Sequence, residues 1–242
     1  MLNRALAAFR AGDVTRDEQL RWLWLACRSV MEVWDDEMWD VLSARHVRLA
    51  REAGALGVLP VALSSRIAVD VFAGDLSAAA SLVDEVQALT EATGTRLEFY
   101  VGLAVAAWQG REANAAELIE PSIGVVSRGE GMGVSVIQWA GAVLYNGLGR
   151  YDDAVAVARH VGERPYQAAW ALPELIEAAT RSGETALASE GVGRLTAVTQ
   201  ASASRGFLQR MIAFPGASVA WHATYWCGFC SLRCVTHLTG ES

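Results

Sequence analysis

A short glycine motif recurs four times along the chain and constrains the fold more than any other feature. In each copy a charged residue follows the glycine, an alanine lies five positions after it and an apolar residue nine positions after it. Residues four apart share one face of a helix, so the alanine and the apolar residue contact the same neighbour. The motif therefore predicts a helix that ends at the glycine, a tight turn, and a second helix packed closely on the first. The four glycines and their alanines are Gly74 with Ala79, Gly110 with Ala115, Gly149 with Ala154, and Gly183 with Ala188.

The spacing of the motif indicates a repeat architecture. Successive glycines are 36, 39 and 34 residues apart, a period typical of helix–turn–helix repeats such as tetratricopeptide repeats. The sequence has no sustained alternation of polar and apolar residues of the kind that strands require. We therefore predict an all-α fold, and within that class a tetratricopeptide-like α-solenoid of about five helix pairs that curves into a right-handed superhelix.

Apolar residues at three- and four-residue steps locate the individual helices. Asp35 or Asp36 is expected to cap one of them, Pro60 and Pro173 are expected in first turns, and Pro121 is expected to break or kink its helix. After a short helix at 2–11, the expected pairs are 15–33 with 36–53, 57–73 with 76–93, 96–109 with 112–128, 132–148 with 151–162, and 166–182 with 185–200. These helices and their linkers make one expected repeat domain over residues 1–203.

Tryptophan and histidine are the side chains in these helices that first suggest a site. Seven tryptophans have helical spacing, so most are expected in the core, with one or two lining a concave groove. His46 and His160 are each expected at the surface or in a groove, since no nucleophile is linked to either by a motif. The tryptophans are Trp22, Trp24, Trp34, Trp39, Trp108, Trp139 and Trp170.

Charge and composition exclude several functions. All 20 basic residues are arginine and the chain has no lysine, which excludes a P-loop and Schiff-base chemistry. The glycine-rich segment 129–133 has no preceding strand, so we interpret it as a linker between helix pairs. The net charge of −7 disfavours binding of nucleic acid by this chain alone. We expect no ATP hydrolysis, no specific DNA binding and no cofactor.

Two uncharged stretches, 131–149 and 211–232, were considered as membrane spans. The first contains five glycines and the second contains Pro215 and His222, whereas a spanning helix is about 20 predominantly apolar residues long. We expect neither to cross a membrane. The start of the chain becomes charged before an apolar signal segment can form, and Cys27 is the only cysteine in the first 226 residues. A cytoplasmic location is therefore expected.

The last 39 residues, 204–242, differ from the rest of the chain. The repeat motif stops, and three of the four cysteines lie here together with two of the four histidines. Three thiolates and an imidazole could hold a tetrahedral zinc ion, although their spacing matches no standard zinc motif. The alternative is a poorly ordered tail that does not match the solenoid. The possible ligands are Cys227, Cys230, Cys234 and His237, with His222 upstream.

Several segments resemble the helical-repeat region of large ATP-binding LuxR-type transcriptional regulators. The most specific are VLYNGLGRY at 143–151 and AWALPELIEAA at 169–179, and the resemblance extends over about residues 3–202. It implies a sensor region that binds a small-molecule inducer or a protein, from a regulator whose ATPase and helix-turn-helix domains are missing here. The function expected is thus a non-catalytic binding module and a fragment of such a regulator. A metal-binding protein that uses the tail, or an enzyme without a recognisable motif, are the alternatives. No catalytic, cofactor-binding or metal-binding residue is assigned.

Overall fold

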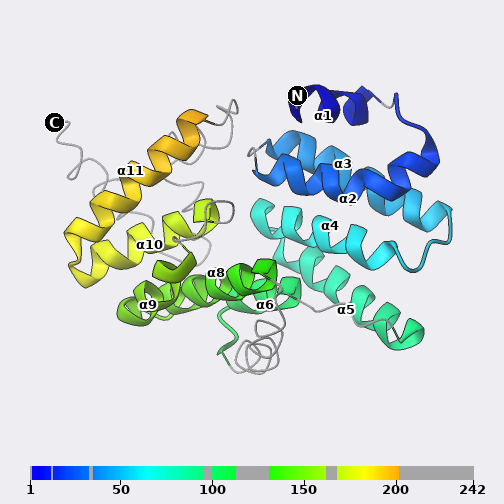
Figure 1. Cartoon of the computed structure of the whole chain (residues 1–242). Helices are drawn as coiled ribbons and strands as arrows, with labels where there is room; N and C mark the ends of the chain where they lie inside the picture. Colours follow the sequence, from blue (N-terminus) through cyan, green and yellow to red (C-terminus); the bar gives the residue numbers. More distant parts are fainter. Residues whose placement is uncertain are drawn as a thin grey trace. The chain divides into compact units, whose positions relative to one another are not determined.

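The chain is all-helical wherever its structure is described. The computed structural model describes residues 2–11, 13–32, 35–94, 100–112, 131–161 and 168–201. These ranges contain ten α-helices and no strand (Figure 1). The prediction of an all-α fold is confirmed. The chain divides into two compact units, Met1–Gly102 and Leu103–Ser242.

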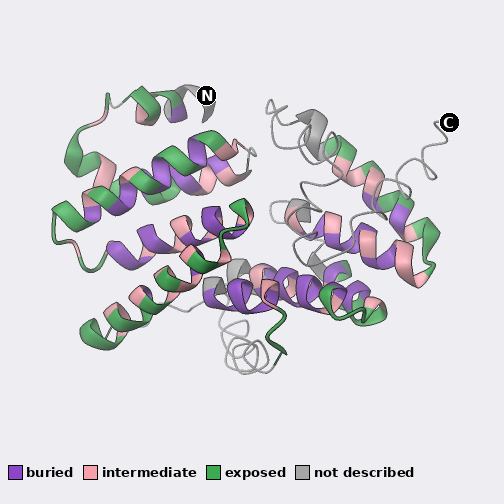
Figure 2. Cartoon of the chain, turned by 180° about the vertical axis from the view of Figure 1, so that it is seen from behind, coloured by how far each residue is buried: buried purple, intermediate pink, exposed green. Residues whose placement is uncertain are grey.

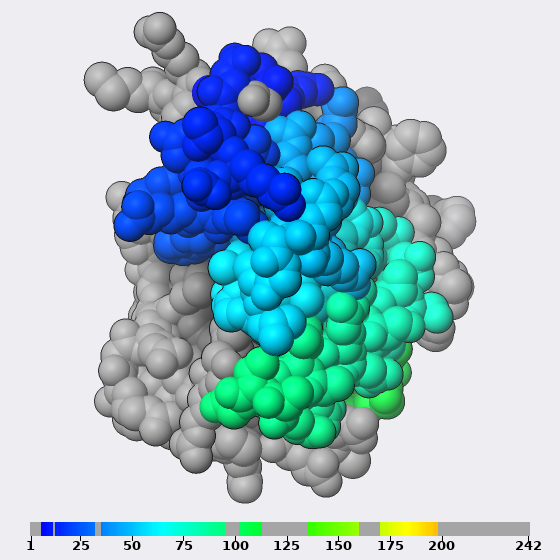
Figure 3. All heavy atoms as spheres, turned by 90° about the vertical axis from the view of Figure 1, so that its right-hand side faces the viewer, coloured from blue at the N-terminus to red at the C-terminus, as the bar shows by residue number. Residues whose placement is uncertain are grey.

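The first unit consists of a short N-terminal helix and two helix pairs. Helix α2 packs against α3, α3 against α4 and α4 against α5, while α1 contacts both α2 and α3. Figure 3 shows α1 and α2 in dark blue beside α4 in cyan. The helices are α1 (Leu2–Ala11), α2 (Arg16–Glu32), α3 (Asp36–Glu52), α4 (Leu59–Ala73) and α5 (Leu76–Thr93). Their core is built on Leu23, Cys27, Val30 and Leu42, each at most 1% exposed.

The second unit contains two further helix pairs. Helix α8 packs against α9, α9 against α10 and α10 against α11, and the first helices of the two pairs, α8 and α10, also contact each other. Most residues of α8 whose burial is described are buried, and they are purple in Figure 2. The helices are α6 (Tyr100–Trp108), which begins just before the unit boundary, α8 (Gly131–Gly147), α9 (Tyr151–Val161), α10 (Ala168–Ser182) and α11 (Thr185–Ala201).

The glycine motif has the structure predicted for it. Gly74, Gly110, Gly149 and Gly183 all have positive φ, between 65° and 84°. Gly74 ends α4, and the next residue, Asp75, caps α5 by accepting a hydrogen bond from the backbone N–H of Ala78 at 2.9 Å. The alanines of three copies, Ala79, Ala154 and Ala188, are fully buried. The fourth alanine, Ala115, lies outside the described residues.

Other local predictions are confirmed in part. Asp35 caps α3 by accepting from the N–H of Met38 at 3.0 Å, and Pro60 lies in the first turn of α4. Pro173 was expected in a first turn and is instead the sixth residue of α10. The buried face that includes Ala171 and Leu172 favours continuing the helix through the proline, although the ring removes one backbone hydrogen bond.

The segment expected as a linker at 129–133 is partly helical. Gly131 and Gly133 belong to the first turn of α8. Residues 129 and 130, Pro121 and the tail at 204–242 lie outside the described residues. No helix in the described ranges is long and apolar enough to cross a membrane.

Substitutions at two glycines, Gly147 and Gly149, can test the left-handed turn that follows α8. Gly149 has φ +73°, a conformation that strains any residue with a Cβ, so Gly149→Ala is expected to lower the free energy of unfolding by about 1 kcal/mol. Gly147 is the last residue of α8, and a Cβ there would meet nothing within 4 Å. Gly147→Ala is therefore expected to be neutral or to stabilise by up to about 1 kcal/mol. Urea unfolding of both variants measures the difference, and equal losses would contradict the assigned turn.

Candidate functional site

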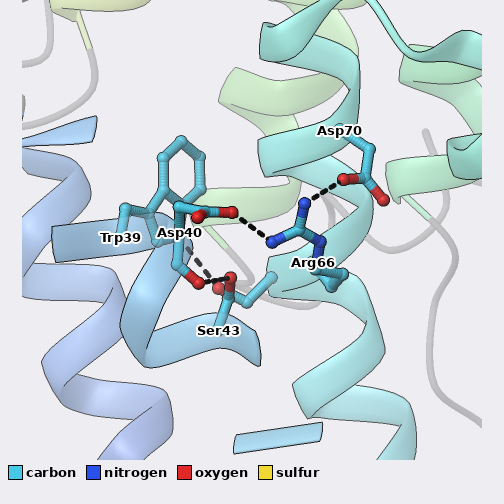
Figure 4. A network of polar contacts seen from close by, with 6 residues as sticks. Trp39, Asp40, Ser43, Arg66 and Asp70 are labelled. Carbon is cyan, nitrogen blue, oxygen red and sulfur yellow. Dashed lines mark hydrogen bonds and ion pairs between the residues drawn. The ribbon is translucent and has the colours of Figure 1, made fainter. Parts of the chain in front are cut away.

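The first unit contains a charged network between α3 and α4 (Figure 4). The guanidinium of Arg66 donates to the carboxylates of Asp40 on α3 and of Asp70 one turn along its own helix. Trp39 Nε1 donates to Ser65 Oγ at 2.9 Å beside it. The buried Asp70 is thus balanced by a cation, and the network joins two helices with its charges paired. We assign it a structural role.

Two chemically reactive side chains in the first unit are buried. Burial raises the pKa of the Cys27 thiol to about 11, and a hydrogen bond with Ser65 offsets only part of that effect. His46 is fully buried, and neither of its ring nitrogens has a hydrogen-bond partner. The expectation that His46 lies at the surface or in a groove is wrong, since Leu42 and Ala50, one turn away on either side, lie on the same buried face.

The buried imidazole of His46 is expected to make the stability of the chain depend on pH. Burial lowers the pKa of His46 from 6.5 to about 4, so unfolding takes up a proton once the pH falls below 6.5. The contribution of His46 to the stability of the chain is then lost progressively as the pH falls from about 6.5 to 4. His46→Leu is expected to raise the free energy of unfolding relative to the wild type, and this increase is expected to be on the order of 2 kcal/mol larger at pH 5 than at pH 8. Urea unfolding at the two pH values measures this, and a gain independent of pH would contradict a neutral buried imidazole.

The tryptophans of the first unit only partly follow the expectation of a core position. Trp39 is 8% exposed and tilts against Phe72 at a ring-centroid distance of 5.8 Å. Trp22 and Trp24 are 44% and 47% exposed, so these two tryptophans do not lie in the core. The buried face of α2 runs through Leu23, Cys27 and Val30, and Trp24 lies about 100° around the helix from Leu23. Trp34 lies outside the described residues.

The second unit holds a buried pair of polar side chains where α8 contacts α10. The amide nitrogen of Asn146 on α8 donates to the carboxylate oxygen Oε2 and to the backbone oxygen of Glu174 on α10, each at 3.0 Å. Asn146 is fully buried and Glu174 is 5% exposed. The amide oxygen of Asn146 is buried and has no hydrogen-bond partner.

The carboxyl group of Glu174 has no balancing charge within the described residues. Helices α6 and α8 contain no charged residue. The other charged side chains of α10, Glu177 and Arg181, pair with each other at 3.1 Å. Burial raises the pKa of Glu174 from 4.5 to about 7, and the hydrogen bond from Asn146 offsets only part of this rise. The group is therefore partly protonated near neutral pH, and its charged form has no cation partner among the described residues.

A row of three tryptophans runs across α6 and the two helices that carry this polar pair. The ring centroids of Trp108 on α6 and Trp139 on α8 are 6.5 Å apart, and those of Trp139 and Trp170 on α10 are 5.8 Å apart. Trp139 is 5% exposed, whereas Trp108 and Trp170 are half-buried. The row therefore connects three helices through aromatic contacts, which we call the tryptophan row.

The spacing of residues along α8 and α10 places the tryptophan row and the polar pair on the same helix faces. Trp170 precedes Glu174 by one turn, and Trp139 precedes Asn146 by two turns, so each aromatic ring shares a helix face with one of the polar groups. The side-chain oxygens of Gln109 and Gln138, each next in sequence to a tryptophan of the row, are buried without a hydrogen-bond partner. The α8–α10 contact thus combines aromatic rings, a carboxyl group and the unsatisfied amide oxygen of Asn146, and it is the candidate site.

Sequence analysis named the tryptophans of this site but missed its polar groups. Glu174 lies on a helix face between Ala171 and Ala178, both buried, and an acidic residue at such a position was the available signal. Of the residues named earlier, His160 and the ligands proposed in the tail lie outside the residues whose side chains are described. Within the described ranges no group of three His, Cys, Asp or Glu side chains could hold a metal ion.

Comparison of the chain with protein-family models, with curated proteins and with solved structures found no match. The class defined by the described residues is that of an all-α protein built from helix pairs.

Proposed function

We propose that the chain is a non-catalytic helical-repeat module that binds a ligand at the tryptophan row and the adjoining Asn146–Glu174 pair. The observation that carries this proposal is the uncompensated polar pair beside three aromatic rings. Burying a carboxyl group without a cation and an amide oxygen without a donor is unfavourable for folding alone. Such groups are retained where they serve recognition, and aromatic rings beside a few polar groups are typical of ligand sites.

The repeat architecture supports the proposal. We propose that the helix pairs form a tetratricopeptide-like solenoid, in which the first helices of successive pairs line the binding face. The tryptophan row crosses α6, α8 and α10, the first helices of three successive pairs under the predicted pairing. The resemblance to LuxR-type regulators agrees with this, because the helical-repeat region of such proteins is where an inducer or a protein is sensed. We propose that the chain corresponds to such a sensor region.

The reactive groups of the first unit favour binding over catalysis. The thiol of Cys27 stays protonated near neutral pH, since its pKa is about 11. The imidazole of His46 is enclosed by the core and contacts no hydrogen-bond partner, so it has no route to a substrate proton.

The test is a binding screen on the full chain with four probes: sucrose, benzoate, adenosine and 2-phenylethylammonium. Each probe is measured by thermal melting and by tryptophan emission, since binding to the folded state raises Tm. We expect at least one probe to raise Tm and change the emission, and to be recovered unaltered by chromatography. Trp170→Leu is expected to lose both responses, whereas Trp22→Leu, the same change at an exposed position of the first unit, is expected to keep them.

Two outcomes of this screen would contradict the proposal. Conversion of any probe into a product would show that the module is catalytic. The absence of a response to all four probes would mean that the tryptophan row is only a packing feature of the second unit.

A further inference from the structure

We propose that the α8–α10 contact binds a primary ammonium group carried on an apolar or aromatic body. This inference rests on the proposed function and names the chemical class of its ligand. The ammonium would lie between the carboxylate of Glu174 and the amide oxygen of Asn146, and the body of the ligand would lie on the ring of Trp170.

The carboxylate of Glu174 is not balanced by a positive charge among the described residues. No cation pairs with Glu174 in the described part of the chain, and its one side-chain hydrogen bond is with Asn146. The charged residues on the helices packed around it are paired or lie on exposed faces, except Arg194 on α11, which is half-buried and forms no ion pair with Glu174 in the described part of the chain. On α10 Glu177 pairs with Arg181, and on α9 Arg159 pairs with Glu184 at the turn before α11. The remaining charged groups of α9 and α11 whose side chains are described are Asp152, Asp153, Glu190 and Arg194.

The polar pair also lacks a hydrogen-bond donor. The amide oxygen of Asn146 is buried without a hydrogen-bond partner, while the amide nitrogen of the same side chain already donates to Glu174. An ammonium group offers three N–H donors and one positive charge. It can therefore satisfy the amide oxygen and the carboxylate together. A neutral alcohol would leave the carboxylate unbalanced, and a quaternary ammonium would have no proton for the amide oxygen.

Two of the aromatic rings are carried by the same helices as the polar pair. Trp170 lies four residues before Glu174 and Trp139 seven residues before Asn146, which places their backbone positions about 6 Å and about 10 Å along the helix axes from the polar pair. The shorter of these spacings suits an arylalkyl ammonium whose charged end contacts Glu174 and whose ring contacts Trp170. Tryptophan faces also attract cations. Trp170 is half-buried whereas Trp139 is 5% exposed, so Trp170 is the ring that a ligand can reach.

The deciding experiment is titration calorimetry of the full chain with 2-phenylethylammonium at pH 8. Two comparison ligands isolate the two features, since 2-phenylethanol lacks the charge and tetramethylammonium lacks the N–H donors. We expect each to bind at least about tenfold more weakly than 2-phenylethylammonium. Glu174→Gln keeps an acceptor for Asn146 but removes the charge, and it is expected to weaken binding at least about tenfold. Glu190→Gln, the same change at an exposed position on α11, is expected to leave the affinity unchanged.

A pH series on the unaltered chain provides a second measurement that does not depend on a variant folding. Only the ionised carboxyl group pairs with the ammonium, so the affinity is expected to fall by about tenfold or more between pH 8 and pH 5.5. Glu174→Gln is expected to remove most of that dependence.

The possible results separate this inference from the function on which it rests. Equal affinity of the wild type and Glu174→Gln, equal binding of the alcohol, or an affinity independent of pH would each overturn the ammonium site. If sucrose, benzoate or adenosine responds through Trp170 and the amine does not, the binding module stands and the ligand class is wrong. If no probe binds, both are wrong.

Discussion

Glu174→Gln is expected to stabilise the chain by about 3 kcal/mol at pH 8 and by less than about 1 kcal/mol at pH 5. Burial raises the pKa of this carboxyl group from 4.5 to about 7, so the folded state favours the protonated form. As the pH rises from 4.5 through 7, the unfolded chain loses its proton first, and the folded chain becomes progressively less stable. Glutamine has nearly the same shape and never ionises, so the variant escapes this loss.

Hydrogen bonding at the site supports the same expectation. The side-chain oxygen of Gln at position 174 can still accept from Asn146, whose amide nitrogen now donates to the carboxylate at 3.0 Å. The new amide N–H groups can also donate to the amide oxygen of Asn146, which has no partner in the wild type. The variant therefore removes a charge without leaving a new buried group unsatisfied.

Urea unfolding at pH 5, 6.5 and 8 measures the prediction as the difference between variant and wild type. His46 opposes Glu174 in part of this range, because its lowered pKa makes the wild type less stable as the pH falls below 6.5. That contribution is common to both proteins and cancels in the difference. Glu190→Gln is the matched control and is expected to stay within about 0.5 kcal/mol of the wild type. A destabilised Glu174→Gln at pH 8 would show that the charged form has a cation partner.

The helix pairs could be predicted from the sequence because their determinants are local. A glycine followed by a charged residue marks a left-handed turn, and the alanine five positions later marks a close contact with the preceding helix. Both properties are decided within about ten residues, so Gly74, Gly149 and Gly183 located the ends of α4, the turn after α8 and the end of α10. Ala79, Ala154 and Ala188 were correspondingly buried.

The candidate site could be predicted only in part because its groups come from distant positions. Asn146 and Glu174 are 28 residues apart, and nothing in the spacing of either helix identifies one as the partner of the other. The helix faces did hold a usable signal, since Glu174 and His46 each lie between apolar residues one turn away on either side. Polar residues at core positions are uncommon, and for that reason each deserved to be considered as a buried group.

A cluster of small residues explains how the helices of the second unit approach one another. Ala154 on α9, Ala178 and Ala179 on α10, and Ala188 on α11 are all fully buried and form one cluster with Val155. Methyl side chains let three helices meet without intervening bulk, and two of these alanines are those of the glycine motif. The polar pair on α8 and α10 depends on this packing, because a shift of α10 would separate Glu174 from Asn146.

Ala154→Trp is expected to destabilise the second unit by roughly 1–3 kcal/mol or more, because an indole has no space among the methyl groups of α10 and α11. Ala197→Trp, the same change at an exposed position of α11, is expected to stay within about 0.5 kcal/mol of the wild type. Thermal melting of both variants measures the contrast. Displacement of α10 should also weaken the contact between Trp139 and Trp170, whose ring centroids are 5.8 Å apart in the wild type. Binding of a ligand at the tryptophan row should therefore weaken in Ala154→Trp but not in Ala197→Trp. An unchanged Tm for Ala154→Trp would mean that these alanines do not form the contact between the helix pairs.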